Sequence, residues 1–526
     1  MLSEAARRKH WAPADSRIGE ESDSAPIHVD WLIDNGEAYE SLIRALRDAR
    51  ESIWVSQLAF DADCKAYASE EGASEMDSPG DSLLDAIVAT SGLHRVSVKI
   101  LLNSTLLLDT RRPLLRSLAR RKPGAELIEV RGISRFPQLL HAKMVIIDGG
   151  RAFLMGSPFV NGYWDTPSHM PVDHRRPRRE LGGRPIHDVS VGVHGPVVHE
   201  LAAIFARLWN GAGPRESADE ARIGPSRSNR RAAAKCDVNV VTTEPGTGRD
   251  SADRGSLATL DALLDGIQRA RSLIYIEHQY LSSRPVVEAL RQALDREPAL
   301  EMIFVLNQNP DVTAYRRWQN ARLADTGLLE HPRVGVFALW STSSRKGSRG
   351  AINQVFVHSK VVIVDDEWAM VGSANLDGAS LDSYGDDFSG RLARRVFRDV
   401  RNFDVSVVFT ARKSARGQNP IRDLRERLWS EHLGAGSFRR AERTSEAQLT
   451  VWRRQALRNV TLLSGCAQSD WVALGGSFVL PYSRSPHPRA QLADVGVQLP
   501  TDVDLAFDPG WLEISFSPNW IRNMFL

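Results

Sequence analysis

The sequence has few of the features that mark disulfide-stabilised, exported or membrane-spanning proteins. Its three cysteines, Cys64, Cys236 and Cys466, are too few and too widely spaced for a disulfide framework or a clustered metal site. No apolar run approaches the roughly 20 residues that span a bilayer, and residues 1–24 are too polar for a secretory signal. We therefore expect a cytoplasmic or peripheral membrane protein with no signal peptide and no transmembrane segment.

A strong excess of charge of one sign is also missing. The 67 Lys and Arg residues nearly balance the 65 Asp and Glu residues, which leaves a formal net charge of +2. Such a balance gives no general case for nucleic-acid binding. With 42% hydrophobic and 25% charged residues, the composition is that of a globular protein, and 526 residues are enough for more than one domain.

What the sequence does contain is an internal duplication. Apolar residues at helical spacing, followed by an apolar strand, occur at 36–61 and again at 257–282. Each half then continues with a predicted strand that ends in Leu-Asn, SVKILLN at Asn103 and EMIFVLN at Asn307. Further on, two histidines lie 217 positions apart (358 − 141) and two aspartates 216 apart (404 − 188). Strands alternating with helices predict an α/β fold of two similar lobes, each a mixed sheet flanked by helices.

The duplication also divides the chain into segments. We expect a polar N-terminal tail at 1–25, a first lobe at 26–214 and a second lobe at 237–435. The stretch 215–236 is rich in Gly, Pro, Ser and Arg, which is typical of a linker. Residues 436–526 repeat neither half, so we expect them to form an extension packed on the second lobe.

Each half carries one copy of the pattern His-x-Lys-x-x-x-x-Asp, as HAKMVIID and HSKVVIVD. Alternate side chains of a strand point the same way, so His141 projects with Lys143 and His358 with Lys360. Two such strands at a lobe interface would place two imidazoles and two ammonium groups around one phosphodiester. One neutral imidazole can attack phosphorus while the other, protonated, gives its proton to the leaving alcohol.

These two strings, with Gly156-Ser157 and Gly372-Ser373 after them, resemble the paired signature of the phospholipase D superfamily. The resemblance implies a pseudo-twofold paired α/β sandwich, His141 as the nucleophile and His358 as the general acid. It also implies that the two lysines hold the phosphate together with Ser157, Ser373 and Asn375. The first copy has Phe159 where the second has Asn375, so its phosphate contacts are expected to be fewer.

Two pairs of aspartates complete the candidate site. Asp188 and Asp404 follow the histidines by 47 and 46 residues (188 − 141 and 404 − 358), and the resemblance implies that they fix the imidazole tautomers, Asp188 that of His141. Asp148 and Asp365 end the motif strands, where we expect them to order the turn. The candidate catalytic residues are thus His141, Lys143, Asp148, Asp188, His358, Lys360, Asp365 and Asp404.

The stretch 169–188 contains His169, His174 and His187 among several arginines, but its spacing fits no standard zinc pattern. We expect a solvated loop near the mouth of the site, and no metal or other cofactor. Four aromatic residues after the Gly-Ser elements could line an acyl or base pocket or could equally pack in the core. They are Tyr163, Trp164, Tyr384 and Phe388.

The resemblance implies a metal-independent phospholipase D that converts a glycerophospholipid to phosphatidic acid and an alcohol, by hydrolysis or by transfer to another alcohol. Residues 427–436, RLWSEHLGAG, resemble a stretch late in lipid-acting members and favour a phospholipid substrate. We expect a monomer that contacts the membrane surface and does not bind nucleic acid. The alternatives are a cardiolipin synthase-like phosphatidyltransferase, a nuclease of the same superfamily and a non-enzymatic binding module.

Overall fold

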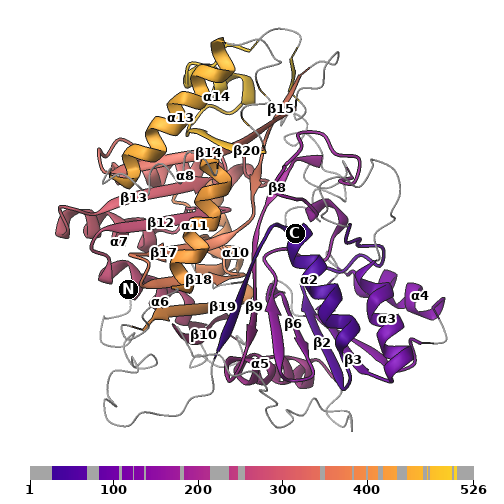
Figure 1. Ribbon diagram of the computed structural model, residues 1–526. Coiled ribbons are helices and arrows are strands. Elements are labelled where there is room, and N and C mark those ends of the chain that lie inside the picture. The colour runs from indigo at the N-terminus through magenta and orange to yellow at the C-terminus, as the bar shows by residue number, and fades with distance from the viewer. Residues whose placement is uncertain are drawn as a thin grey trace.

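The computed structural model has two α/β lobes side by side, with the C-terminal segment on the second lobe (Figure 1). It describes residues 27–67, 82–105, 109–121, 124–134, 138–177, 183–213, 236–246, 255–343, 350–381, 384–397, 401–412, 419–434, 447–465, 471, 474, 476–499 and 503–505. The predicted tail and nearly all of the predicted linker lie outside these ranges. Within them, no helix combines the length and apolarity needed to cross a bilayer.

The first lobe is built on a seven-stranded mixed sheet with the order β1-β9-β7-β6-β2-β3-β4. Pairs β2/β3 and β3/β4 are parallel, and the other four neighbouring pairs are antiparallel. The strands are His28–Ile33 (β1), Ser52–Gln57 (β2), Ser97–Asn103 (β3), Ile128–Ile133 (β4), Met144–Ile147 (β6), Arg151–Leu154 (β7) and Val189–His194 (β9).

The second lobe repeats this order as β10-β19-β18-β17-β12-β13-β14 within a larger sheet, with the same alternation of parallel and antiparallel pairs. The α/β prediction with two similar lobes is therefore confirmed. The strands are Cys236–Glu244 (β10), Leu273–His278 (β12), Glu301–Leu306 (β13), Val334–Ser343 (β14), Lys360–Val364 (β17), Trp368–Gly372 (β18) and Asn402–Ala411 (β19).

Additional strands extend the second sheet. Ser256–Leu257 (β11) pairs with β10, and Ala351–Gln354 (β15) pairs with β14 and with Asp504–Leu505 (β21). Ser477–Pro481 (β20) pairs with β14 from the C-terminal segment, in which Gln448–Gly465 (α13) and Pro488–Asp494 (α14) are helical. The segment after residue 436 is thus joined to the second lobe by backbone hydrogen bonds.

Helices cover both faces of each sheet, which explains why the parallel strands are apolar on both sides. On the first sheet, Asp34–Asp48 (α2), Leu83–His94 (α3) and Arg111–Ala119 (α4) pack on one face and Val197–Ala212 (α5) on the other. On the second, Ala258–Arg269 (α6), Arg284–Arg296 (α7) and Thr313–Asp325 (α8) face Pro420–Leu433 (α11) and α13 across the sheet.

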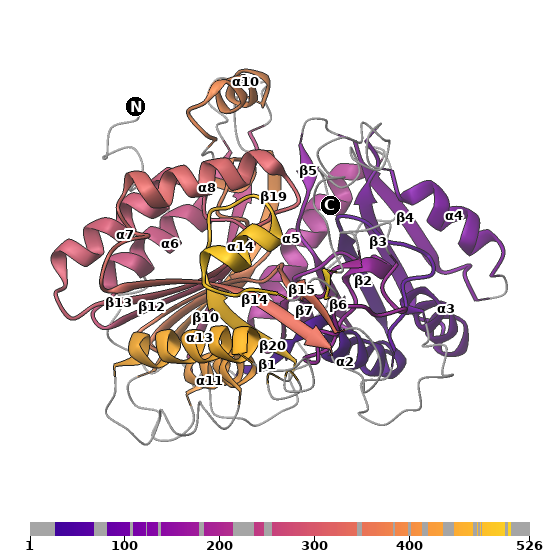
Figure 2. The same ribbon diagram turned by 90° about the horizontal axis from the view of Figure 1, so that it is seen from above.

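The lobes share one continuous core. Apolar side chains of both sheets, α5, α11 and α13 form a single buried cluster, which includes Trp54, Val191, Tyr275, Val405 and Trp452. Figure 2 shows the two sheets meeting along this shared interior. Two short helices, Gly378–Leu381 (α9) and Phe388–Phe397 (α10), lie in the loop before β19. The shared core fixes the lobes against each other, so side chains from both can form one rigid site.

Candidate active site

The segments that carry the two histidines are exchanged between the lobes. Leu139–Leu140 (β5), from the first half, pairs with β19 of the second, and the His141 amide donates to the Phe403 carbonyl at 3.0 Å. Phe356–Val357 (β16), from the second half, pairs with Ile186–His187 (β8), and the His358 amide donates to the His187 carbonyl at 2.8 Å. Each histidine is therefore held by backbone of the opposite half.

Two asparagines at the ends of matching strands hold these exchanged segments. The Asn103 side chain accepts from the Leu140 amide at 2.9 Å and donates to the Leu140 carbonyl at 2.9 Å. Asn307 does the same for Val357, accepting at 2.8 Å and donating at 2.7 Å. The sequence analysis saw both asparagines as part of the repeat but assigned them no role. Their bonds fix the residue before each histidine.

The imidazoles and the aspartates are paired crosswise. His141 Nδ1 donates to Asp404 Oδ1 at 2.6 Å, and His358 Nδ1 donates to Asp188 Oδ2 at 2.9 Å. The prediction that Asp188 orients His141 is wrong, because the strand exchange carries each histidine to the aspartate of the other half. Each pair is buried, and each fixes the tautomer that leaves Nε2 free of a proton.

The Gly-Ser elements support these aspartates. Ser373 donates to Asp404 Oδ1 at 2.9 Å, and Ser157 donates to Asp188 Oδ2. A Cβ at Gly156 would overlap the Asp188 carboxylate, so this approach requires glycine. A hydroxyl carries one hydrogen, so in this arrangement neither serine has a donor left for a phosphate oxygen. Their predicted phosphate contacts, and that of buried Asn375, stay predictions.

The two lysines lie in the same interior as the histidines. Lys143 Nζ donates to His141 Nε2 at 3.1 Å, and Lys360 Nζ donates to Gln279 Oε1 at 3.0 Å. Gln279 was not predicted, since its half-repeat partner is not an amide. Burial, and then the neighbouring Lys360, lower the pKa of Lys143 to about 7, and burial lowers the pKa of Lys360 to about 8. The repulsion between the ammonium groups shows that both copies contribute to one site.

Both imidazoles have pKa values well below the ordinary value for histidine. Burial, and then Lys143, lower the pKa of His141 to about 4, while burial and Lys360 lower the pKa of His358 to about 3. We expected opposite protonation states for the pair. A bound anion would offset the two ammonium charges and favour protonation of one imidazole, so the proton is expected to enter with the substrate.

Sequence models of two families match the second half of the chain. One, described as phospholipase D, matches residues 339–461, and the other, described as the phospholipase D-like domain of cardiolipin synthase, matches residues 263–388. Both matched ranges include His358 and Lys360. The chain belongs to the phospholipase D superfamily.

Among curated members of the superfamily, the chain is similar to phospholipase D alpha 1 of Nicotiana tabacum, with 23% identity over 56% of this chain and 49% of that protein. It is also 23% identical to phospholipase D A of Dictyostelium discoideum, over 56% of this chain and 27% of that one. The chain thus spans at most about half the length of these phospholipases D.

Among solved structures, the phosphatidylserine synthase of Haemophilus influenzae matches with a TM-score of 0.49 and 13% identity, over 77% of this chain and 85% of that one. The polyphosphate kinase of Porphyromonas gingivalis matches with a TM-score of 0.39 and 11% identity, over 77% of this chain and 50% of that one.

The last aspartate of each phospholipase D motif lies away from the histidines, at the far end of its strand. Asp148 accepts hydrogen bonds from the amides of residues 50–52 at 2.7–2.8 Å, and Asp365 accepts from those of residues 271–273 at 2.7–2.9 Å. Both adopt left-handed backbone angles, with φ of 51° and 54°. Their inclusion among the catalytic residues is not supported, whereas the expected role in ordering the turn agrees with these bonds.

The stretch 169–188 differs from the solvated loop that we expected. His169 and His187 are fully buried and contact carboxylates, and only His174 has an exposed side chain, at 77%. The prediction of a solvated loop is wrong for these two histidines, because the carboxylates of Asp34 and Glu431, which are remote in sequence, contact both of them in the interior. His187 lies directly behind the candidate active site, since it precedes Asp188, and the His169 ring packs edge-on against it at 5.6 Å.

The four aromatic residues that the sequence left open fall into different environments. Tyr163 packs edge-on against the His358 ring at 5.0 Å, and Trp164 lies in the first-lobe core. Tyr384 joins an aromatic cluster with Tyr280, Tyr315 and Trp318. Phe388, at the start of α10, is 75% exposed. Tyr163 is therefore the one of these four whose ring is seen to pack against a candidate catalytic histidine within the described residues.

The crossed pairing leads to a prediction about two matched variants. If the site cleaves phospholipid as the resemblance implies, Asp404→Asn, which removes the group that orients His141, should lower turnover by about 10²–10⁴-fold, and Asp188→Asn should act similarly through His358. With an acidic phenol as leaving group, Asp188→Asn should recover activity and Asp404→Asn should not. The value of kcat/KM for release of the leaving group, measured on both substrate types, tests this because it reports the steps before hydrolysis of the adduct. Recovery by Asp404→Asn alone would mean that the nucleophilic and acidic roles are exchanged, while Asp148→Asn, remote from both rings, is the control.

Proposed function

We propose that the chain is a phospholipase D-type phosphodiesterase that acts on glycerophospholipids through a phosphohistidine. The observation that carries this proposal is the pair of buried histidine–aspartate contacts, His141–Asp404 and His358–Asp188, formed crosswise beside two buried lysines. A buried ammonium pair of this kind favours an anionic ligand, because an anion offsets the desolvation of both charges. A phosphodiester supplies that charge.

In the first step, the lone pair on His141 Nε2 attacks phosphorus and the bond from phosphorus to the head-group oxygen breaks. His358 Nε2–H gives its proton to that oxygen, so the head group departs as a neutral alcohol. His358 Nε2 makes no hydrogen bond within the described part of the chain, which leaves this atom available to the leaving group. Lys143 and Lys360 balance the charge on the phosphoryl oxygens.

In the second step, water or an alcohol attacks the phosphorus atom and passes its proton to His358 Nε2. The phosphorus–nitrogen bond breaks and His141 recovers its lone pair. Hydrolysis gives phosphatidic acid, and attack by an alcohol gives a new phosphatidyl ester. The assignment of His141 as nucleophile rests on the superfamily resemblance, because the two histidine sites are related by the duplication.

Product analysis tests the substrate class and the reaction type. Phospholipid labelled in the phosphatidyl part is incubated with the protein, with and without a primary alcohol, alongside single-stranded DNA. Formation of phosphatidic acid, and of phosphatidyl alcohol when alcohol is present, supports the proposal. Release of nucleotides with untouched lipid would favour a nuclease instead.

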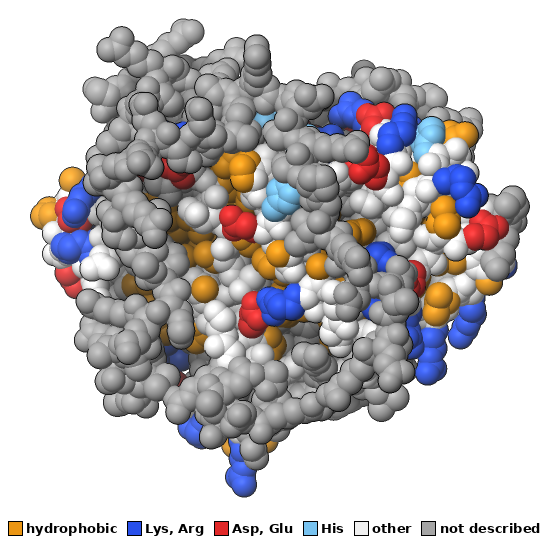
Figure 3. Space-filling model, turned by 90° about the horizontal axis from the view of Figure 1, so that it is seen from below, with side chains coloured by type: hydrophobic (Ala, Val, Ile, Leu, Met, Phe, Trp, Pro, Cys, Tyr) orange, Lys and Arg blue, Asp and Glu red, His pale blue; other side chains and the backbone are white. Residues whose placement is uncertain are grey.

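A phosphatidyltransferase is the second candidate. It is favoured by the match of residues 263–388 to the phospholipase D-like domain of cardiolipin synthase. If phosphatidylglycerol is supplied as both donor and acceptor in the same assay, a phosphatidyltransferase would form cardiolipin as its product. On the face in Figure 3, the described basic side chains are interspersed with acidic ones, so this face presents no continuous basic stripe of the kind that binds nucleic acid.

We also propose that the protein works as a monomer at the membrane surface and docks through α10. This helix stands clear of the lobes in Figure 2 and exposes Phe388 at 75% and Leu392 at 50%, beside the exposed Arg391 and Arg395. Apolar side chains next to basic ones suit the surface of an anionic bilayer.

The double variant Phe388→Ser and Leu392→Ser should therefore lower activity on phospholipid vesicles by about 10-fold, because it removes apolar area that would enter the bilayer. Activity on a soluble short-chain phospholipid should not change. Vesicle co-sedimentation measures the binding directly. Leu457→Ser, which alters an exposed leucine on α13, is the control, and equal losses on soluble and vesicle substrates would contradict membrane docking.

A further inference from the structure

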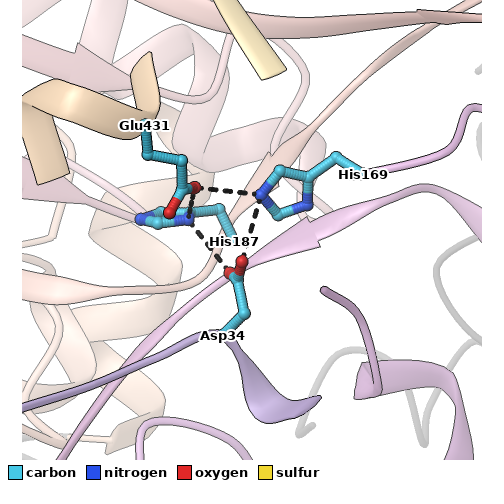
Figure 4. A group of neighbouring side chains, drawn as sticks. All are labelled: Asp34, His169, His187 and Glu431. Atoms are coloured by element: carbon cyan, nitrogen blue, oxygen red, sulfur yellow. Dashed lines mark hydrogen bonds and ion pairs between the residues drawn. The ribbon is translucent and has the colours of Figure 1, made fainter. Parts of the chain in front are cut away.

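Behind the proposed active site lies a buried group of two imidazoles and two carboxylates that the chemistry above does not use. Asp34, His169, His187 and Glu431 point toward one another from four separate segments of the chain (Figure 4). The first three side chains are 0% exposed and Glu431 is 11% exposed. Three come from the first lobe, and Glu431 comes from α11 of the second.

The facing atoms lie within 4.8 Å of one another, and the four histidine–carboxylate distances among them are close to those of a tetrahedral ligand set. His187 Nδ1 lies 2.9 Å from Glu431 Oε1 and 3.1 Å from Asp34 Oδ1. His169 Nε2 lies 3.1 Å from Glu431 Oε1 and 3.4 Å from Asp34 Oδ2. Four ligands at about 2.0–2.1 Å from a zinc ion would be about 3.3 Å apart, so these four histidine–carboxylate distances need to change only by tenths of an ångström to suit one.

The outer nitrogens of both imidazoles are held by further carboxylates. His169 Nδ1 lies 3.1 Å from Asp165 Oδ2, and His187 Nε2 lies 2.7 Å from Glu277 Oε1. Asp165 is fixed by Arg176 at 2.7 Å. A carboxylate on the outer N–H turns the lone pair of the other nitrogen inward, which is the usual arrangement behind metal-binding histidines.

Two of the inward atoms lack the hydrogen bonds that a purely polar network would give them. Asp34 Oδ2 and His187 Nδ1 are buried, yet neither makes a hydrogen bond of acceptable geometry within the described residues, and the same holds for the outer His187 Nε2, which contacts Glu277 as an ion pair. Asp34 also adopts the left-handed conformation, with φ of 60°, which is uncommon outside glycine.

The duplication provides an internal comparison. Strand register makes Thr243 the counterpart of Asp34 and Phe403 the counterpart of His187, since Ile33 pairs with Val189 as Thr242 pairs with Val405. The Leu-Trp pairs of α5 and α11 make Gly211 the counterpart of Glu431. None of these three counterparts is a metal-binding residue, so the group is not a by-product of the fold but specific to one of the two equivalent positions.

We propose that Asp34, His169, His187 and Glu431 bind one divalent transition-metal ion, with zinc as the cation that fits best. A set of four ligands that includes two imidazoles suits zinc, whereas calcium and magnesium favour a larger number of ligands, all of them oxygen atoms. Two neutral imidazoles and two carboxylates would balance the charge of the ion. Local spacing could not predict this site because its ligands lie at positions 34, 169, 187 and 431.

The ion would join the lobes at a point that supports the proposed general acid. Asp34 accepts from the Asp188 amide at 3.3 Å, and its own amide donates to the Asp188 carbonyl at 2.8 Å. The His187 carbonyl accepts from the His358 amide at 2.8 Å. The metal would touch no reacting atom, so it would position Asp188 and His358 without taking part in the chemical step.

The competing account is a network of ion pairs with both histidines protonated. Burial alone would lower the pKa of His169, but the carboxylates of Asp34 and Asp165 outweigh burial and raise this pKa to about 10. Such a network needs no metal, so elemental analysis separates the two accounts.

The test uses the full chain, purified without chelators or metal-affinity resin, incubated with excess zinc and then dialysed. Mass spectrometric elemental analysis should find about one zinc per chain in the wild type and in His174→Ala, which alters the exposed histidine of the same segment. His169→Ala and Glu431→Gln should lose the metal. A wild type that retains no zinc, or two ligand variants that retain it fully, would overturn the proposal.

A second measurement covers the case in which the ligand variants do not fold. X-ray absorption of zinc in the wild type should show four nitrogen or oxygen neighbours at about 2.0–2.1 Å, and sulfur neighbours would overturn the assignment. Thermal unfolding of the wild type should shift to higher temperature as zinc is added to chelator-treated protein. Neither readout depends on the proposed lipid activity.

Discussion

The His141→Asn variant should lose both turnover and the covalent phosphoryl adduct. Asparagine has no nitrogen lone pair that can attack phosphorus, so the two-step route through a phosphohistidine is closed. Loss of a nucleophile of this kind should slow phospholipid turnover by at least about 10⁴-fold, with the residual rate coming from charge stabilisation by the two lysines. Rapid quenching followed by mass spectrometry of acid-labile phosphohistidine measures the adduct, and release of head group measures turnover.

His278→Asn is a matched control, because His278 is a buried histidine in β12 that the proposed reaction does not use. An adduct on residue 358 in the wild type would exchange the two histidine roles. If the wild type and His358→Asn both yield no adduct at any quenching time, direct attack by water becomes the better account.

The His358→Asn variant should lose activity in a way that depends on the leaving group. On natural phospholipid the head group must leave with a proton, so removal of the general acid should slow the reaction by about 10²–10⁴-fold. A diester with an acidic phenol departs without a proton, and its rate should fall far less. The ratio of the two rate losses, taken as kcat/KM, is the measured quantity.

The same variant should also accumulate a phosphohistidine from the phenyl diester, because hydrolysis of the adduct needs His358 as the base. Equal losses on both substrates would mean that His358 does more than move a proton. His141→Asn provides the comparison, since its loss should not depend on the leaving group.

The lobes and the catalytic side chains of the motifs can be predicted from sequence because they depend on local patterns. Alternation along a strand places Lys143 beside His141, and the repeated order of elements predicts two equivalent sheets. The repeat also marked Asn103 and Asn307 as matched strand ends. Their hydrogen bonds to the residue before each histidine could not be predicted, because these bonds depend on how the strands are placed in space and not on the local sequence pattern.

The crossed histidine–aspartate pairs could not be predicted, because the repeated sequence pattern is the same whether each aspartate pairs with the histidine of its own half or of the other half. Asp188 and Asp404 follow their own histidines by 47 and 46 residues, yet the observed partner of Asp404 is 263 positions away (404 − 141). Only the exchange of β5 and β16 distinguishes the two arrangements. The burial of His169 and His187 was missed for the same reason, since Asp34 and Glu431 are remote in sequence.

The exchanged strands also bear on how the molecule acquires its native state. The contact of Leu140 with Phe403 closes a chain loop of 263 residues (403 − 140), and that of Val357 with His187 closes one of 170 residues (357 − 187). Contacts between such distant positions form slowly. Each sheet can gain most of its strands from its own half, but the imidazoles reach their aspartates only when the halves dock. Recovery of activity on refolding should therefore lag behind recovery of secondary structure, which makes turnover a reporter of the last long-range contacts to form.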